Sequence, residues 1–312
     1  MQDIWIFSED HEISKQLLTL GQETKKSSKK KIYVLTTDND FAKEVATCGA
    51  DVVYVLKSSN GEIQRPESLA KGVAQLINEE NPSVFFVGGT RRGKELAAKV
   101  AALTDSGMVT DANKIRFDNG IVTERMMYGG LAVITETLGE KTVVTIAPKS
   151  YDAAIAGDTS AEIIMKEIEI EQNIQVIEIL EVEGADISSA TKVICVGRGL
   201  SKKEDLSMAD DLASAVGGVV GCTRGVAEDY HWLPEELYIG LSGQKIKPEL
   251  YISMGVSGQI QHVAGIRYSK FIVAVDTNEN APIFEAADYG IVGDLNEVIP
   301  ALTRAIKSAT GK

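Results

Sequence analysis

Residues 250–265 read LYISMGVSGQIQHVAG, and this stretch decides the fold of the second half of the chain. Its first five residues are mostly apolar and predict a buried strand that ends at the first glycine. Ser257 and Gly258 then let the chain turn into a helix, whose free N–H groups and positive dipole end can hold a phosphate. Gln261 and His262 fall in the first turn of that helix, within reach of a polar ligand anchored at its N-terminus. The stretch therefore predicts an anion site between a strand and a helix.

A lone histidine such as His262 is more often a structural residue than a functional one, so the neighbouring sequence decides its interpretation. A glycine-containing turn, GLSG, precedes it at 240–243, and a strand that ends in AVD follows it at 274–276. This combination favours a functional role for His262.

Arg198 lies between two glycines in another turn from strand to helix. The dinucleotide fingerprint GxGxxG requires a third glycine where this chain has Lys202, so the turn alone is weak evidence. Gly197 and Gly199 still allow close approach of the backbone, and the Arg198 guanidinium suits a phosphate or an electron-rich ring.

The second half follows a strand–helix rhythm that predicts a smaller doubly wound unit with a parallel sheet. Strands are expected at 192–196, 250–253, 271–275 and 290–292, and helices near 203–215, 260–265 and 294–308. A short segment of small and polar residues, GADISSA at 184–190, precedes this rhythm. We therefore expect two domains, at residues 1–184 and 185–312.

The first half also alternates β-branched or aromatic runs with amphipathic runs, which predicts βαβ units and a parallel sheet. The expected strands are 3–7, 32–36, 52–56 and 84–87, and the expected helices are about 10–20, 40–48, 66–79 and 93–103. The pattern from 107 to 182 predicts a mixed extension of the sheet, with antiparallel-looking runs at 131–137 and 142–146 and turns at 118–120 and 128–130. Alternating acidic and apolar residues at 161–182 suit an exposed or partner-facing strand pair.

Composition and charge exclude several classes of function. The chain has 45 Asp and Glu against 32 Lys and Arg, and a net charge of -13 has the wrong sign for nucleic acid. The longest weakly polar stretch, 212–222, is about half the ~20 residues that span a bilayer, and residues 1–10 lack a signal-peptide pattern. We therefore expect a cytoplasmic protein with no membrane span and no nucleic-acid partner.

Metal and hydrolytic chemistry also find no support in the sequence. The three cysteines, Cys48, Cys195 and Cys222, are widely spaced and contain no CxxC, which predicts buried thiols without disulfides or zinc. Three scattered histidines are too few for a metal cluster, and no GxSxG nucleophile elbow occurs. We expect no catalytic residue of these kinds and no metal.

The segment GGTRRGKE at 88–95 departs from the phosphate loop GxxxxGK[ST] at its last position. A phosphate loop has a Ser or Thr at this position, and its hydroxyl holds magnesium. Glu95 would instead place a carboxylate beside the phosphate oxygens. We interpret this segment as a structural or partner-facing turn.

Residues 193–309 resemble the alpha subunit of electron transfer flavoproteins, and the similarity extends more loosely through the first half. The matching pieces, in order and spacing, are GRG (197–199), VGCTR (220–224), YIGLSG (238–243), PELYI (248–252), GVSGQIQHVAG (255–265) and APIFEAADYGIVGD (281–294). They cover nearly all of this region, and YGGLA at 128–132 also resembles the family. The resemblance implies an N-terminal nucleotide-binding-like α/β domain that packs on a beta subunit, and a C-terminal FAD-binding domain.

The resemblance also implies which residues hold the diphosphate and adenosine of FAD. The backbone N–H groups of Ser257, Gly258, Gln259 and Ile260, with the Ser257 hydroxyl, would bind the diphosphate. Arg198 and Thr223 would add a cation and a hydroxyl nearby. Asp276 and Asp294 match positions that contact the adenosine end, although Asp276 stands where asparagine is usual and so replaces an amide by an acceptor-only group.

The isoalloxazine ring of FAD would lie along a second set of residues. By the same resemblance, Ile239, Gly240, Leu241 and Ser242 would line the ring, with the Ser242 hydroxyl near N5. Ser242 stands where threonine is common, which keeps this hydroxyl. Arg224 and His262 would set positive charge or donors near the ring, and a cationic neighbour would stabilise the negative charge of reduced flavin.

The implied function is that of an electron carrier subunit, which does no bond chemistry on a substrate by itself. It would form a heterodimer with a beta subunit and shuttle electrons between a dehydrogenase, of the acyl-CoA class, and another redox partner. Two alternatives stay open: the alpha subunit of an electron-bifurcating, NADH-oxidising complex, and a non-catalytic nucleotide-binding scaffold. The retained Arg198, Ser242 and His262 argue against the scaffold.

Overall fold

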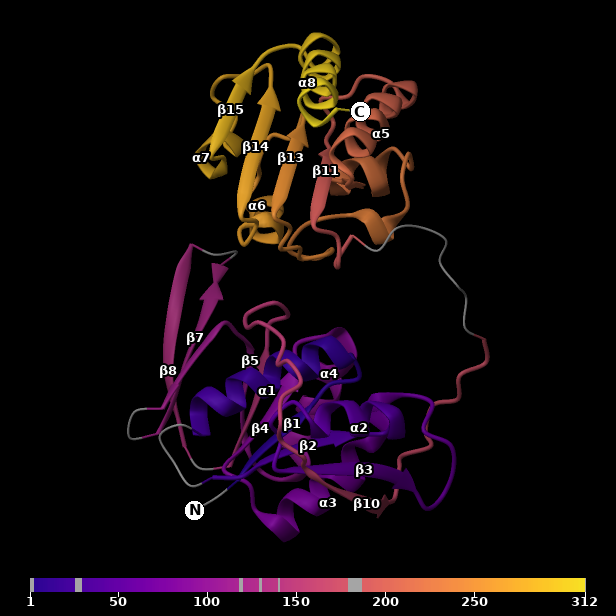
Figure 1. Cartoon of the computed structure of the whole chain (residues 1–312), viewed down its shortest axis with the longest axis vertical. Helices are drawn as coiled ribbons and strands as arrows, with labels where there is room; N and C mark the ends of the chain where they lie inside the picture. Colours follow the sequence, from indigo (N-terminus) through magenta and orange to yellow (C-terminus); the bar gives the residue numbers. More distant parts are fainter. Residues whose placement is uncertain are drawn as a thin grey trace. The chain divides into compact units, whose positions relative to one another are not determined.

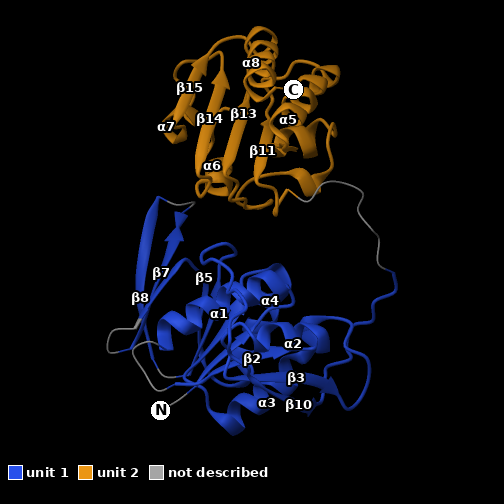
Figure 2. Ribbon diagram, viewed as in Figure 1, with its two compact units in different colours: residues 1–180 blue, residues 181–312 orange. Residues whose placement is uncertain are grey.

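A computed structural model of the chain describes residues 3–25, 30–117, 120–128, 131–139, 141–178 and 187–311. The chain divides into two compact units, residues 1–180 and 181–312 (Figure 2). The domain boundary expected at residue 184 lies outside the described residues, and so do Asp118, Asn119, Gly129 and Gly130 of the two expected turns.

The first unit is built on a seven-stranded sheet in the order β10-β3-β2-β1-β4-β9-β5 (Figure 1). All of its strand pairs are parallel, which confirms the expected α/β class. The strands are β1 (Ile4–Phe7), β2 (Ile32–Thr36), β3 (Val52–Ser58), β4 (Val84–Gly88), β5 (Gly107–Ala112), β9 (Thr142–Ile146) and β10 (Glu162–Ile168). The helices between them are α1 (His11–Lys25), α2 (Asn39–Ala46), α3 (Ala70–Glu80, after a 3-10 turn at Pro66–Leu69) and α4 (Arg91–Leu103).

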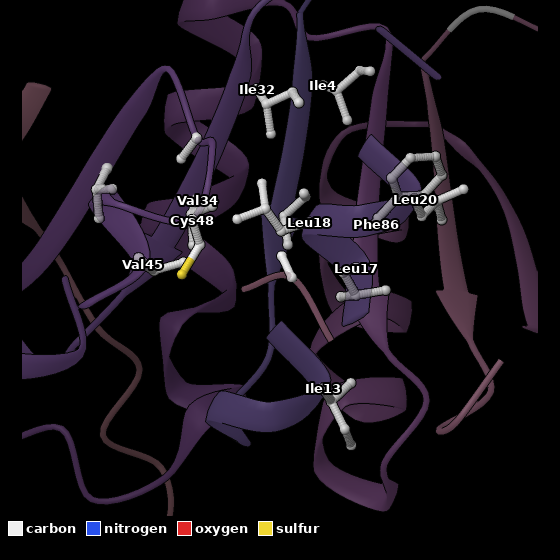
Figure 3. Packing of buried hydrophobic residues seen from close by; sticks show 14 of the residues in the cluster. Ile4, Ile13, Leu17, Leu18, Leu20, Ile32, Val34, Val45, Cys48 and Phe86 are labelled. Carbon is white, nitrogen blue, oxygen red and sulfur yellow. The ribbon is translucent and has the colours of Figure 1, made fainter. Parts of the chain in front are cut away.

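Successive side chains of the central strands point to opposite faces of this sheet, so a buried core lies on each face. Ile4 and Ile6 of β1 belong to one core cluster with residues of α1 and α2. Figure 3 shows Ile4 in this cluster with Leu17 and Leu18 of α1 and Val45 of α2. The intervening Trp5 and Phe7 pack with α3 and α4 on the opposite face. Both faces are therefore covered, as parallel sheets require.

The segment from 107 to 146 differs from its expected arrangement in one strand. The antiparallel part forms a separate three-stranded sheet of β6 (Lys114–Phe117), β7 (Ile121–Met127) and β8 (Ala132–Leu138). The run expected to be antiparallel at 142–146 is instead β9, which lies parallel between β4 and β5. Every residue of β9 is buried, and a strand covered on both faces is typical of a parallel sheet.

The expected strand pair at 161–182 is a single strand. β10 pairs in parallel with β3 at the edge of the large sheet, and residues 169–178 form no helix or strand. At this edge position, apolar as well as acidic side chains of β10 are exposed, with Ile163 43% and Met165 60% exposed.

The turn at 88–95 has a structural explanation. Thr90 caps α4 by accepting a hydrogen bond from the Gly93 N–H at 2.8 Å, and a Cβ at position 93 would overlap the Gly88 carbonyl oxygen. The glycines therefore serve the close packing of β4 against α4.

The second unit is a five-stranded parallel sheet in the order β12-β11-β13-β14-β15. Its elements are β11 (Lys192–Val196), α5 (Leu206–Val216, after a 3-10 turn at Lys203–Asp205), β12 (Val219–Cys222), β13 (Leu250–Met254), α6 (Ile260–Ile266), β14 (Phe271–Asp276), α7 (Ile283–Ala286), β15 (Tyr289–Val292) and α8 (Leu295–Thr310). A π-helical turn, Gly225–Asp229, and a 3-10 turn, Glu235–Leu237, lie between β12 and β13. Two of these elements, β12 and α7, are not among those expected: glycines at 217, 218 and 221 weaken the strand pattern of β12, and α7 has only four residues.

Helices cover both faces of the second sheet. Leu212 of α5 and Ile299 of α8 belong to the core on one face, and Ile266 of α6 and Ile283 of α7 belong to the core on the other. This arrangement confirms the expected doubly wound unit. The strand order reverses between β11 and β13, and ligands of such folds bind at the carboxyl ends of the strands at this switch point.

Three further observations concern the described residues as a whole. All three cysteines are free and buried, as expected. No described helix combines the length and apolar character needed to cross a bilayer. In the described ranges, no three His, Cys, Asp or Glu side chains gather as metal ligands would.

Candidate functional site

A pocket of about 580 Å³ opens at the carboxyl ends of β11, β12, β13 and β14. It lies at the switch point of the sheet, and its volume is in the range of small-molecule and cofactor sites. The predicted site residues that line it are Arg198, Thr223, Arg224, Ile239, Ser242, Ser257, Gly258, Gln259, Gln261, His262 and Asp276. Segments up to 78 residues apart in sequence thus meet at one site.

Four predicted residues do not line the pocket. Gly240 is buried and packs on Gly265, Leu241 is half exposed, and Ile260 contributes to the prediction only through its backbone N–H. The Asp294 carboxylate caps α8 by accepting a hydrogen bond from the Asn296 N–H at 2.8 Å. Its contact with adenosine stays a prediction.

The floor of the pocket is formed by two loops whose backbones touch. The Gly199 N–H donates to the Gly255 carbonyl oxygen at 2.9 Å, and a Cβ on either glycine would lie within 2.6 Å of the other residue's Cα. Gly255 also has φ +64°, a conformation that favours glycine. The third glycine of the dinucleotide fingerprint is not needed, because Lys202 is exposed and precedes α5.

The turn into α6 presents unpaired backbone donors. In the part of the chain that the structure describes, the N–H groups of Ser257, Gly258, Gln259 and Ile260 donate to no backbone or side-chain acceptor. No side chain caps α6. These donors therefore remain available to an anionic ligand.

The two arginines of the pocket differ in their partners. The Arg198 side chain lies over Gly225, where a Cβ would come within 2.7 Å of Arg198 Cδ, and none of the ion pairs between described residues includes Arg198. Arg224 Nε donates to Glu228 Oε2 at 2.6 Å, and this hydrogen bond raises the Arg224 pKa. Glu228 and Asp229 also line the pocket, although neither was predicted. The only signal for Glu228 was its spacing of four residues from Arg224.

Arg224 and His262 were expected to set positive charge or donors near the isoalloxazine ring, and the surroundings of His262 favour a neutral imidazole, so it is not a source of positive charge. The residue is 7% exposed, its Nδ1 lies 3.0 Å from the Ile239 carbonyl oxygen, and its Nε2 lies 2.7 Å from the Tyr251 hydroxyl. A carbonyl can only accept, so Nδ1 carries the proton and Nε2 accepts from Tyr251. Burial lowers the His262 pKa from 6.5 to about 4. Both ring nitrogens are thus used within the protein, and positive charge in the pocket comes from the arginines.

The ring of His262 gives a prediction for the dependence of stability on pH. Its folded pKa is lowered, so the unfolded chain takes up a proton below about pH 6.5 while the folded chain does so only near pH 4. The free energy of unfolding should therefore fall on acidification through this window, by on the order of 3 kcal/mol from this group. Urea unfolding at pH 7.5 and pH 5 should show a smaller loss for His262→Gln than for the parent. Equal losses in the two proteins would contradict the buried neutral ring.

Two hydroxyl groups that line the pocket are hydrogen-bonded to each other. Tyr238 and Ser242 share a hydrogen bond of 2.9 Å between their hydroxyl oxygens. Either oxygen can donate in this pair, so the Ser242 hydroxyl keeps a further position for a polar atom in the pocket.

Comparisons with known proteins agree with this site. Residues 4–171 match the family described as the electron transfer flavoprotein domain, and residues 186–267 match the electron transfer flavoprotein FAD-binding domain. The chain is 35% identical over 309 residues to the protein named "Putative electron transfer flavoprotein subunit YdiR" of Escherichia coli K12, with 97% of each chain covered. It is 33% identical to the protein FixB of Salmonella typhimurium LT2 and 34% identical to FixB of Escherichia coli O7:K1, again over 97% of each chain. The chain therefore belongs to the electron transfer flavoprotein family, as an alpha-type subunit whose cofactor is FAD.

Proposed function

We propose that this chain is the FAD-binding alpha subunit of a heterodimer that carries electrons between a dehydrogenase of the acyl-CoA class and a second redox partner. The observation that carries the proposal is the pocket at the carboxyl edge of the second sheet. It combines unpaired N–H donors, two arginines and a buried apolar wall in a domain that matches the FAD-binding domain of the family.

The residues present fit the diphosphate of FAD. Two negative phosphates require hydrogen-bond donors and positive charge. The N–H groups of residues 257–260 supply donors that no other group uses, and Arg198 supplies a cation outside any ion pair of the described residues. We infer that these groups, with the Thr223 hydroxyl, hold the diphosphate.

The other end of the pocket fits a flat aromatic ring. Ile239 lies in the buried core behind the pocket, and Ser242 and Arg224 offer polar groups that line it. Bound FAD supplies the group that accepts and gives electrons. Arg224 places positive charge where reduced flavin gains negative charge, while His262 contributes a fixed neutral edge.

A beta subunit is the partner with which alpha-type subunits of this family pair. The first unit exposes large apolar side chains around the β7–β8 hairpin, with Tyr128 76%, Leu131 75% and Val133 62% exposed. Clustered exposed apolar residues are typical of surfaces that a partner covers. We infer that the beta subunit covers this hairpin.

Counting flavins in the purified heterodimer tests the proposed function. We expect one FAD for each alpha–beta pair, assigned to this chain by its loss when the alpha-subunit pocket is altered. Flavin is released by denaturation and quantified by absorbance against protein mass. Two flavins would favour the electron-bifurcating alternative, and none would favour a nucleotide-binding scaffold, so either result would overturn the proposal.

A further inference from the structure

The π-helical turn Gly225–Asp229 holds Arg224 and Glu228 together at the rim of the pocket. The Tyr230 N–H donates to the Gly225 carbonyl oxygen at 3.0 Å, which closes the wide turn. Val226 and Ala227 at its centre are buried in the core. The fold therefore fixes the backbone that carries Arg224 and Glu228, and such turns are frequent at functional sites.

The charged side chains that line the pocket include more carboxylates than arginines. Arg198 and Arg224 face three carboxylates, those of Glu228, Asp229 and Asp276, and His262 is neutral. Only Glu228 is in direct contact with a pocket arginine, at 2.6 Å from Arg224 Nε. A paired arginine acts on a distant charge as a dipole, so its field falls off faster than that of a free cation.

We propose that Glu228 is a positioning residue that fixes the Arg224 guanidinium and offsets its charge, and so limits how strongly the pocket stabilises negative charge on reduced flavin. The inference rests on the proposed function, because it requires the flavin ring to lie beside Arg224. The ion pair is half exposed, so its contribution to folding stability is small. Its effect on the flavin is larger, because a bound ring excludes the water that screens these charges.

Glu228→Gln tests the proposal in the FAD-loaded heterodimer. Glutamine keeps an oxygen that can accept from Arg224 Nε, but it removes the negative charge. At a fixed applied potential, the ratio of one-electron-reduced to oxidised flavin should rise about three- to tenfold. Spectroelectrochemical titration of the flavin absorbance measures this ratio, and FAD content should equal that of the parent.

Asp229→Asn is the matched control. Asp229 lines the same pocket and carries the same charge, but no hydrogen bond between described residues joins it to Arg224. In Asp229→Asn, the ratio of one-electron-reduced to oxidised flavin should change less than it does in Glu228→Gln. An equal change in both variants would show a general effect of charge and would overturn the positioning role.

Arg224→Ala separates this inference from the proposed function. Glu228→Gln should have no effect in a protein that already carries Arg224→Ala, because its effect passes through the guanidinium. If Arg224→Ala lowers the ratio but Glu228→Gln leaves it unchanged, the role of Glu228 is wrong and the proposed function stands. If neither variant changes the ratio, the flavin ring does not lie beside Arg224 and the role of Glu228 is wrong, while the flavin count of the heterodimer still decides the proposed function.

Discussion

Gly258→Ala should unfold the second unit more easily and release its FAD. Gly258 has φ +81°, and a Cβ there would overlap the amide nitrogen and the Cα of Ile283, which is fully buried at the start of α7. Backbone strain costs about 1–3 kcal/mol, and overpacking adds about 1–3 kcal/mol. The N–H groups of the turn would also move away from the diphosphate. Urea unfolding, with the FAD content after gel filtration, measures both losses.

Gly217→Ala is the control for Gly258→Ala. Gly217 also has positive φ, +69°, and ends α5, but nothing lies within 4 Å of a Cβ at this position. The control therefore adds backbone strain without a clash and should cost only about 1 kcal/mol. It should keep its FAD. If both variants lost the same stability and both kept FAD, the packing of Gly258 on α7 would not support the site.

Sequence patterns were sufficient for the parts of the fold that local chemistry determines. Strand ends, helix starts and the glycine turns at 197–199 and 255–258 depend on residues close together in sequence. β9 was assigned the wrong direction because a short apolar run has the same pattern in both sheet types. Its parallel partners, β4 and β5, are set by the whole sheet.

The charge state of the site could not be obtained from sequence. His262 is neutral because Tyr251, eleven residues earlier, and the Ile239 carbonyl, twenty-three residues earlier, reach its two nitrogens. Glu228 reaches Arg224 because the chain between them forms a helical turn, and no helix was expected at Gly225–Asp229. The first feature arises from tertiary contacts and the second from a local turn, and each of these groups has an ordinary alternative role.

Arg198 is the cation of the pocket that stands outside every ion pair of the described residues, and this distinguishes it from Arg224. It follows β11 in the loop that touches Gly255, so the backbone beneath it is fixed by the contact of the two loops. The glycine at 225 leaves room for its side chain to lie along the pocket. A guanidinium held in this way beside unpaired N–H groups is suited to bind the oxygens of a diphosphate.

Arg198→Ala should therefore weaken the binding of FAD roughly ten- to a hundredfold, since loss of a hydrogen bond to a charged group costs about 1.5–3 kcal/mol. Fluorescence titration of flavin-depleted heterodimer with FAD measures the affinity, and added salt should weaken the parent more than the variant. Lys202→Ala is the control, because Lys202 is an exposed cation in the same loop that does not line the pocket. The control should bind FAD like the parent, since general positive charge near the site is not what holds the diphosphate. Equal affinities in Arg198→Ala and Lys202→Ala would show that Arg198 does not contact it, and the N–H groups of residues 257–260 would then hold the diphosphate without a cation.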